Sequence, residues 1–164
     1  VVGGIRLIPT ESPHMLRDVF SYLVEGHQTP IGSTTWEISR LVIKKSSDSS
    51  VSDMRYRFQE LIHGLTSFAV LHNIQEYVSV SEDRVERLFR IAGLPMKRLG
   101  NISLMDGVHV VATSIEINEK VLKDVKSKYF HLGFNRFFTK EEHEGGSIPC
   151  IQDSSEVKCN QIFQ

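Results

Sequence analysis

Short apolar runs alternate along this chain with longer stretches of helical period. The short runs have the length and composition of buried strands and cover residues 1–8, 35–43, 77–80 and 108–117. The adjacent glycines Gly3 and Gly4 predict a bulge or a close backbone approach in the first run. The pattern therefore predicts four strands, the first of them irregular.

Between the strands, apolar residues recur every three to four positions, which predicts four helices. These lie between Pro13 and Gly26, over about residues 53–72, between Ser81 and Gly93, and from Asn118 to about Tyr129. Side chains able to cap a helix start precede three of them, namely Thr10 and Ser12, Ser81, and Asn118. The two glycines mark helix ends.

The alternation of strands and helices predicts an α/β fold. We expect one domain over residues 1–164, a three-layer sandwich with a mixed central sheet flanked by helices. Residues 44–53 are a polar, serine-rich loop, and about residues 139–164 are expected to form a peripheral tail. Because the chain opens inside a strand and without an initiator Met, we expect an N-terminal part of the domain before Val1.

Composition narrows the classes of partner. The 164 residues carry 19 basic and 20 acidic side chains, so the net charge of −1 gives no overall attraction to nucleic acid or to a membrane surface. No apolar run is long enough to cross a membrane. Cys150 and Cys159 are too few for a disulfide framework, which favours a reducing cytoplasm. Neither they nor the seven histidines show metal-ligand spacing, and no glycine-rich nucleotide loop is present, so no metal or cofactor is expected.

The strongest candidates for chemistry are charged side chains on strands that otherwise look buried. Burying a charge is costly unless the charge is paired or used. In a regular strand, Glu37 and Ser39 share one face with Leu41 and Ile43, whereas Arg40 points to the other face. A bulge in this strand would bring the Glu37 and Arg40 side chains to one site.

Two interpretations of these side chains stay open. A carboxylate beside a hydroxyl can hold a water and take a proton from a nucleophile, which would make Glu37 a general base. Alternatively, Glu37 only forms an ion pair with Arg6 or Arg40. Arg6 has the fork geometry to clamp a ligand carboxylate. By periodicity, Phe20 and Trp36 are core residues, and a ligand-stacking role for Phe20 is the less favoured alternative.

A basic series marks the third predicted helix. Arg84, Arg87 and Arg90 recur every third residue, and Lys97 follows just beyond the helix. Acidic residues between them dilute this charge, so a solvated helix face is one interpretation. The other is a docking surface for an acidic carrier protein or a phosphate-bearing ligand.

Three motifs follow one another in the first 40 residues. They are Arg6-Leu7-x-Pro9-Thr10, a helix with Met15-Leu16 and Phe20, and Trp36-Glu37-x-Ser39-Arg40. Val78-Ser79-Val80-Ser81 and a helix that ends in Arg90-Ile91-Ala92-Gly93 come later. In this order and spacing the motifs resemble those of the acyl-homoserine-lactone synthases, the autoinducer synthases of bacterial quorum sensing. The resemblance covers about residues 1–100.

This resemblance implies an acetyltransferase-like fold and an acyltransferase. Family members join S-adenosylmethionine to an acyl chain carried on acyl carrier protein or, in some members, on coenzyme A. The amine attacks the thioester, and the carboxylate then displaces the sulfonium group, which closes the lactone and releases 5′-methylthioadenosine. S-adenosylmethionine is therefore expected as a substrate, and an acyl carrier as the partner.

The resemblance also implies roles for individual residues. Glu37 is the expected base, with Ser39 and Arg40 beside it. Arg6, Arg40 and Phe20 are expected to bind S-adenosylmethionine. The family's N-terminal part supplies an arginine, aromatic residues and two aspartates to the same site, and these 164 residues contain none of them.

The acyl chain and its carrier are assigned to other parts of the chain. Ser79 falls where the family often has a hydroxyl or small residue beside the acyl chain, and its hydroxyl could bond a 3-oxo group. Phe68, on the apolar face of the helix at residues 53–72, is a further acyl-chain candidate. The basic series described above is the expected docking surface for the carrier.

Two other functions stay open at this point. An acetyltransferase of the same broad fold would carry a glycine-rich pyrophosphate loop after the central strand, but Lys44, Lys45 and serines stand there instead. A non-catalytic α/β module that docks a partner through its basic helix is the second alternative.

Overall fold

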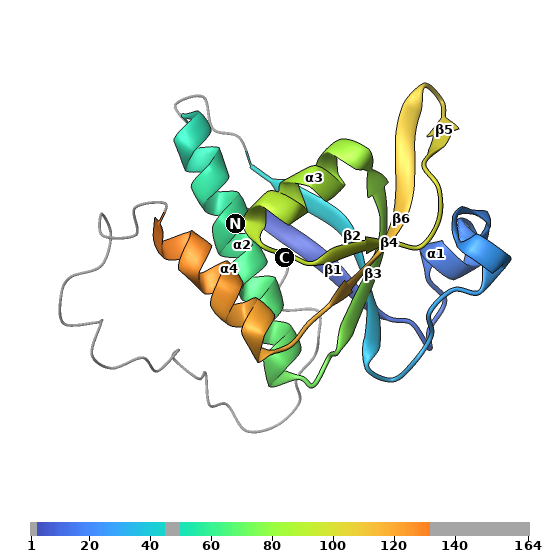
Figure 1. Ribbon diagram of the computed structural model, residues 1–164, viewed down its shortest axis with the longest axis horizontal. Coiled ribbons are helices and arrows are strands. Elements are labelled where there is room, and N and C mark those ends of the chain that lie inside the picture. Colours follow the sequence, from blue (N-terminus) through green and yellow to red (C-terminus); the bar gives the residue numbers. More distant parts are fainter. Residues whose placement is uncertain (1–2, 45–49, 132–164) are drawn as a thin grey trace.

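A mixed, six-stranded sheet forms the centre of the molecule in the computed structural model, which describes residues 3–44 and 50–131 (Figure 1). Its strands are β1 (Gly3–Pro9), β2 (Thr35–Ile43), β3 (Glu76–Glu82), β4 (Met96–Arg98), β5 (Ser103–Met105) and β6 (Val108–Glu116). The strand order is β1-β2-β3-β6-β4, and β5 pairs with β6. Only β2 and β3 run parallel; every other pair is antiparallel.

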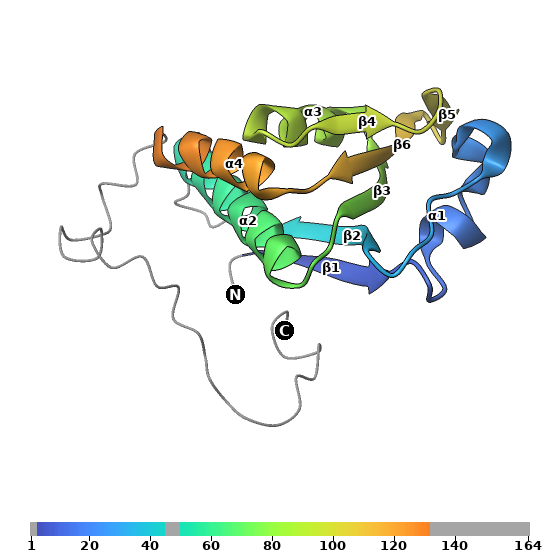
Figure 2. The same ribbon diagram turned by 60° about the horizontal axis from the view of Figure 1, so that its bottom comes forward.

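Helices cover the two faces of this sheet unequally (Figure 2). They are α1 (Met15–Asp18), α2 (Val51–Leu71), α3 (Asp83–Ala92) and α4 (Glu119–His131), with short 3-10 turns η1 (Ser21–Leu23) and η2 (Glu25–His27). The helices α2, α3 and α4 pack on one face, and α2 and α4 lie side by side. The segment α1-η1-η2 packs on the other face. We call these the α2 face and the α1 face.

Side-chain alternation along the strands separates the two cores. Tyr77 and Ile115 are buried in the core under α2, whereas Val78 and Ala112 pack with Leu16 of α1. The expected fold class, a mixed sheet flanked by helices, is confirmed, and the strand predicted over residues 35–43 has those bounds in the structure.

The first predicted helix is wrong in its length. Instead of one helix between Pro13 and Gly26, the segment forms one turn of α-helix and two 3-10 turns. The expected hydroxyl caps are also wrong, because His14 is the N-cap residue and its side chain makes no capping bond. Leu16 and Leu23 are nevertheless buried. The apolar pattern therefore predicted correctly which side chains are packed, but it did not predict the backbone conformation.

The ends of the later helices follow the predictions except at one cap. Asn118 accepts a hydrogen bond from the Val121 backbone N–H at 3.0 Å, and Gly93 ends α3 with a φ of 107°. Ser81 was expected to cap α3, but it is still part of β3 and the N-cap residue is Glu82. The strand predicted over residues 77–80 is therefore longer than expected.

Two three-residue strands were not predicted. β4 follows Pro95, and β5 forms a hairpin with β6 through Asp106 and Gly107, both of which have positive φ. Three residues are too few to show a period of two, so pairing with the long strand β6 defines these strands. The expected tail at about residues 139–164, Cys150 and Cys159 lie outside the described residues.

Candidate active site

The candidate site lies where β2 and β3 stop pairing. Their parallel ladder runs from Thr35 opposite Glu76 to Ile38 opposite Ser79. Both strands then continue, to Ile43 and Glu82, without pairing with each other. The backbone beyond Ile38 and Ser79 therefore has no ladder partner between these two strands.

Glu37 is the buried charge at this point, with only 1% of its surface exposed. It stands opposite Val78 and points to the α1 face, because its neighbour Ile38 belongs to the core under α2. Its carboxylate accepts hydrogen bonds from the backbone N–H groups of Met15, at 3.2 Å, and Leu16, at 2.7 Å. These are among the N–H groups that a helix start leaves without an intrahelical partner.

The predicted alternative, an ion pair of Glu37 with Arg6 or Arg40, is wrong within the described residues, since neither guanidinium contacts the carboxylate. A carboxylate has about four acceptor positions. The two amides occupy two of them, and the charge is stabilised by the helix start. The remaining capacity can accept a further donor, such as a water or a substrate N–H.

The bulge that would change the face of Arg40 is present. Gly4 pairs with Val42 and Arg6 with Ser39, so one residue of β1 stands opposite Arg40 and Leu41. Arg40 has a φ of 53°, in the left-handed region. The extra residue moves Leu41 to the α2 face, where it packs against the core. The expectation that Leu41 shares the face of Glu37 is therefore wrong.

Arg6 and Ser39 form a pair beside Glu37. They are opposite each other on β1 and β2, and Arg6 Nε donates to Ser39 Oγ at 3.0 Å. Arg6 is exposed, and Ser39 is the one hydrogen-bond partner of its guanidinium group among the described residues. Arg40 is also exposed, and its guanidinium group has no hydrogen-bond or ion-pair partner within residues 3–44 and 50–131. Two exposed guanidinium groups thus lie near the buried carboxylate in sequence and register.

Phe20 belongs to the same face of the sheet. It is half-buried, packs against the core formed by Leu16, Leu23 and Val78, and its ring centroid lies 6.3 Å from that of Tyr22. Its predicted place in the core is confirmed. The remaining part of the ring is available on the α1 face.

Ser79 is the last residue of β3 that pairs with β2, and it points to the α2 face. It is 2% exposed, and its hydroxyl shares a hydrogen bond with the Thr113 hydroxyl at 2.8 Å. Two residues further on, the Ser81 hydroxyl is buried and has no hydrogen-bond partner among the described residues. Sequence reasoning missed Ser81 because a serine before a helix looks like a cap.

Phe68 packs on the α2 face, at the other end of the ladder. Its ring contacts Trp36, with ring centroids 6.3 Å apart, and the His72 ring at 4.1 Å. Trp36 precedes Ile38, the last residue of β2 that pairs with β3, by two positions. The Phe68 ring is therefore packed in the core, as its helical spacing also requires.

The four expected docking residues do not form one surface. Arg84 and Arg87 are exposed on α3, and Arg84 pairs with Glu82. Lys97 lies between Met96, which is buried under α2, and Arg98, which contacts α3. Alternation along β4 therefore places Lys97 on the α1 face, away from the α3 arginines.

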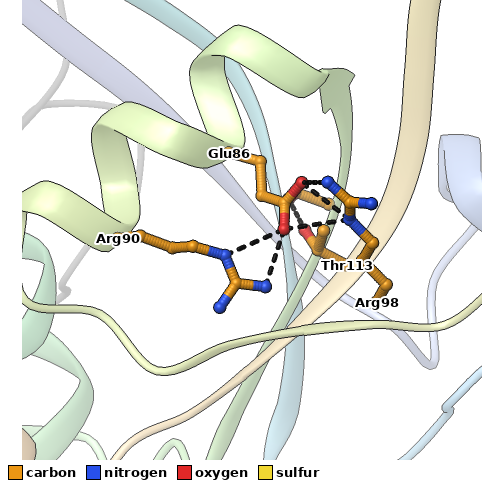
Figure 3. A network of polar contacts seen from close by, with 5 residues as sticks. Glu86, Arg90, Arg98 and Thr113 are labelled. Carbon is orange, nitrogen blue, oxygen red and sulfur yellow. Dashed lines mark hydrogen bonds and ion pairs between the residues drawn. The ribbon is translucent and has the colours of Figure 1, made fainter. Parts of the chain in front are cut away.

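Arg90 binds the buried carboxylate of Glu86. The sequence analysis considered this residue only as one of the acidic residues that offset the basic series. Glu86 is 1% exposed, and Arg90 and Arg98 reach it from opposite sides (Figure 3). The shortest contacts are 2.7 Å from each arginine. Burial alone would raise the pKa of Glu86, but the hydrogen bonds from Arg98 and Arg90 outweigh burial and hold this pKa below its usual value.

Among residues 3–44 and 50–131, no group of three or more His, Cys, Asp or Glu side chains is arranged to bind a metal ion. No helix in the same residues is long and apolar enough to cross a membrane. The polar groups of the site are therefore carboxylate, guanidinium, hydroxyl and backbone N–H groups.

Comparison with known proteins places this arrangement in a family. The autoinducer synthase family model matches residues 1–125. The acyl-homoserine-lactone synthase of Vibrio anguillarum is 31% identical over 121 residues, which cover 73% of this chain and 63% of that protein. The AHL synthase LasI has a TM-score of 0.69 at 29% identity, over 77% of this chain and 64% of that chain. The CoA-dependent synthase BjaI, solved with SAM and isopentyl-CoA, has a TM-score of 0.71 at 24% identity and covers 79% and 59%.

The fold class is thus the acetyltransferase-like sandwich of these solved synthases. The chain belongs to the autoinducer synthase family, because the family model matches most of its length. The resemblance seen in the sequence is confirmed. The chain spans about three-fifths of the length of the first two curated relatives, 63% of one and 59% of the other.

Proposed function

We propose that the protein is an acyl-homoserine-lactone synthase that makes a quorum-sensing signal. It transfers an acyl chain from acyl carrier protein or acyl-coenzyme A to the amine of S-adenosylmethionine and then closes the lactone. The observation that carries this proposal is the buried Glu37 carboxylate at the end of the β2–β3 ladder, in a chain of the autoinducer synthase family.

In the first step, Glu37 takes a proton from the substrate ammonium group through a water. The free amine attacks the thioester carbonyl carbon, the C–N bond forms and the thioester C–S bond breaks. The carrier leaves as a thiol, which takes up the proton that the attacking nitrogen loses when the amide forms. The two backbone N–H groups at the start of α1 hold the Glu37 carboxylate in one conformation. The base is therefore already positioned for the nucleophile when the substrate binds.

In the second step, the substrate carboxylate attacks the carbon attached to the sulfonium sulfur. The C–O bond closes the lactone, the C–S bond breaks, and the bonding electrons stay on sulfur, which leaves in 5′-methylthioadenosine. Arg6 and Arg40 hold the substrate carboxylate, Ser39 fixes the Arg6 side chain, and Phe20 lies against the adenosine.

We place the acyl chain between β2 and β3 beyond their last paired residues. An acyl chain that enters between these strands meets Ser79 and Ser81 on the α2 face. The Ser79 hydroxyl already shares a hydrogen bond with Thr113, whereas the buried Ser81 hydroxyl has no partner in the described part of the chain. This difference favours Ser81 over Ser79 as the group that meets an oxygen on the acyl chain. Phe68 supports the core behind this region, since its ring packs on Trp36.

The outer face of α3 is the proposed docking surface for the carrier. Arg84 and Arg87 are exposed there beside Leu88 and Ile91, which are 48% and 54% exposed. Apolar anchors next to positive charges suit an acidic carrier protein. Lys97 is not part of this surface. Arg90 contributes only those guanidinium N–H groups that do not bind Glu86.

No cofactor beyond the two substrates takes part in this reaction, because both bonds form by displacement at activated carbons. We place the enzyme in the bacterial cytoplasm, where S-adenosylmethionine and acyl carriers are made.

The test is a product assay with the complete protein. It is incubated with S-adenosylmethionine and a series of acyl carrier proteins and acyl-coenzyme A donors, and the products are measured by mass spectrometry. We expect an N-acyl-homoserine lactone and an equal amount of 5′-methylthioadenosine. Acetylated amine from acetyl-coenzyme A, with no lactone from any longer chain, would instead support the acetyltransferase alternative.

A further inference from the structure

Among the histidines whose side-chain burial the structure describes, His14 alone is buried, and the reaction above does not use it. It is 3% exposed and lies directly before α1. Its ring nitrogen Nε2 is buried and has no hydrogen-bond partner within residues 3–44 and 50–131. Buried polar atoms nearly always have a partner in folded proteins, so an unpaired one points to a missing donor.

The other contacts of His14 fix the chemical character of this nitrogen. Nδ1 lies 2.9 Å from the Ser12 carbonyl oxygen, which can only accept, so Nδ1 carries the proton. In the neutral ring with the proton on Nδ1, Nε2 carries a lone pair and accepts hydrogen bonds. The partner that this form of His14 lacks is a donor.

The residue is also held in place from its backbone. The His14 backbone N–H donates to Asp18 Oδ2 at 3.0 Å, and Nδ1 holds the ring from the other side. Three consecutive backbone N–H groups, of His14, Met15 and Leu16, thus bind carboxylates, the last two that of Glu37. Ring and carboxylate are fixed by the same turn of chain.

The chain connection through Met15 sets an upper limit on the distance between the imidazole and Glu37. The Met15 N–H, adjacent to His14 in the chain, is 3.2 Å from Glu37 Oε1. Standard bond lengths then put His14 Nε2 within about 10 Å of that oxygen. A small cation that bound both groups would meet a carboxylate on one side and, from a neutral imidazole, a lone pair on the other.

We propose that His14 Nε2 accepts a hydrogen bond from the ammonium group of S-adenosylmethionine, an inference that rests on the proposed function. An ammonium nitrogen has three N–H donors. Glu37 removes one proton through water, and His14 retains a second N–H, which orients the lone pair of the resulting amine. His14 is thus a positioning residue for the nucleophile.

Two substitutions separate this role from a structural one. The Asn side chain places its amide N–H where Nδ1–H stands and has nothing at the Nε2 position, and Asn is a favourable N-cap residue. The Gln side chain reaches the Nε2 position and offers a carbonyl oxygen there. His14→Asn therefore keeps the hydrogen bond to the Ser12 carbonyl and loses the acceptor at the Nε2 position. His14→Gln keeps an acceptor at the Nε2 position and loses the hydrogen bond to Ser12.

The experiment measures the affinity of both variants of the complete protein for S-adenosylmethionine and for 5′-methylthioadenosine, by calorimetry. The second ligand lacks the ammonium group. We expect His14→Asn to weaken S-adenosylmethionine binding about tenfold or more, as for a lost hydrogen bond to a charged group, and to leave 5′-methylthioadenosine binding unchanged. His14→Gln should bind both ligands nearly as wild type does.

The opposite order, with His14→Gln impaired and His14→Asn normal, would show that His14 only supports the turn and would overturn the proposal. Equal losses for both ligands in His14→Asn would overturn it as well, because the lost contact would then be to the adenosine. Wild-type protein that binds neither ligand refutes the proposed function itself, so the two failures are distinguishable.

Discussion

Glu37 illustrates how one side chain can serve both fold and chemistry. A fully buried carboxylate normally requires a cation, but here two backbone N–H groups of α1 take that place. The arginines nearby therefore remain available for a ligand. The same bonds tie α1 to β2, so we expect removal of the charge to affect the position of α1 as well as the proposed reaction.

Glu37→Gln tests the chemical part of this role. The amide retains one acceptor for Leu16 but places an NH₂ group towards the Met15 N–H, and it cannot take a proton. We expect turnover to fall about 100-fold or more, the usual contribution of a general base. The free energy of unfolding should fall by about 2 kcal/mol or less. Steady-state kinetics and urea unfolding measure the two effects.

Glu76→Gln is the matched control. Glu76 lies on the same face of the sheet, opposite Thr35, and its carboxylate accepts hydrogen bonds from the Thr35 and Ser114 hydroxyls. It is not placed in the reaction, so its variant should keep turnover close to wild type. Equal losses in both variants would mean that the carboxylates matter only for folding.

Glu86 is the second buried carboxylate, and it acts on stability. Its pKa is lowered in the folded state by Arg98 and Arg90. Such a group stabilises the fold above its unfolded pKa of about 4.3, and this contribution is lost as the pH falls through the lowered folded pKa. Glu86→Gln should therefore cost about 2 kcal/mol at pH 7 and reduce the loss of stability between pH 7 and pH 3.

Unfolding free energies across this pH range check the prediction. Glu82→Gln serves as the control, since Glu82 pairs with Arg84 at the surface and an exposed pair contributes less than about 1 kcal/mol. If the wild-type protein and Glu86→Gln lost stability in parallel on acidification, the buried carboxylate would not be the acid-sensitive group.

At the level of elements, the irregular segment α1-η1-η2 depends on one close contact. A Cβ added to Gly100 would lie 2.2 Å from the Leu23 carbonyl oxygen and 3.2 Å from the Glu25 nitrogen. The Glu25 N–H in turn donates to the Leu99 carbonyl at 2.8 Å. The chain after β4 therefore holds η1 and η2 against the α1 face.

Gly100→Ala should destabilise the protein by about 2 kcal/mol, because the contact is with backbone that cannot move without breaking this bond. Gly64→Ala is the control: nothing lies within 4 Å of the added Cβ in the middle of α2. It should stabilise the protein by about 0.5–1 kcal/mol. Thermal or urea unfolding measures both, and a neutral Gly100→Ala would show that η1 and η2 shift freely.

These elements also show how far the sequence alone could lead. The strand at residues 35–43 and the end of α3 at Gly93 were predictable, because each has a local signal of period or of a positive φ. The bulge at Arg40 has none, since arginine rarely adopts positive φ. One inserted residue reversed the face of Leu41, and the face of a side chain decides whether it belongs to the site.

The first helix failed for a related reason. Met15, Leu16 and Leu23 keep helical spacing, but Glu37, 21 residues beyond Leu16, binds the amides at its start, and Leu99 binds Glu25 at its end. The segment is shaped by contacts distant in sequence. Burial of Glu37 was predictable from its strand, whereas its amide partners and the unpaired His14 nitrogen were not.

At the scale of the whole molecule, the two faces of the sheet divide the proposed reaction. Glu37 and Phe20 lie on the α1 face, and Ser79 and Ser81 on the α2 face. The faces meet where β2 and β3 cease to pair, which is where an acyl chain would pass from one to the other. In the proposed reaction, the carrier that delivers this chain docks on the outside of the molecule, where α3 presents exposed arginines.

Arg87→Glu tests this docking surface. Arg87 is exposed and has no ion-pair partner among the described residues, so its reversal disturbs no internal contact. We expect the KM for acyl carrier protein to rise about tenfold, which corresponds to about 1.4 kcal/mol, and the KM for S-adenosylmethionine to stay unchanged. The difference in KM between variant and wild type should shrink as salt is added, because ions screen exposed charges.

Lys123→Glu, the same charge change on the exposed side of α4, should leave both KM values unaltered. Equal effects of the two reversals would indicate a response to net charge, and docking would then have to be sought away from α3.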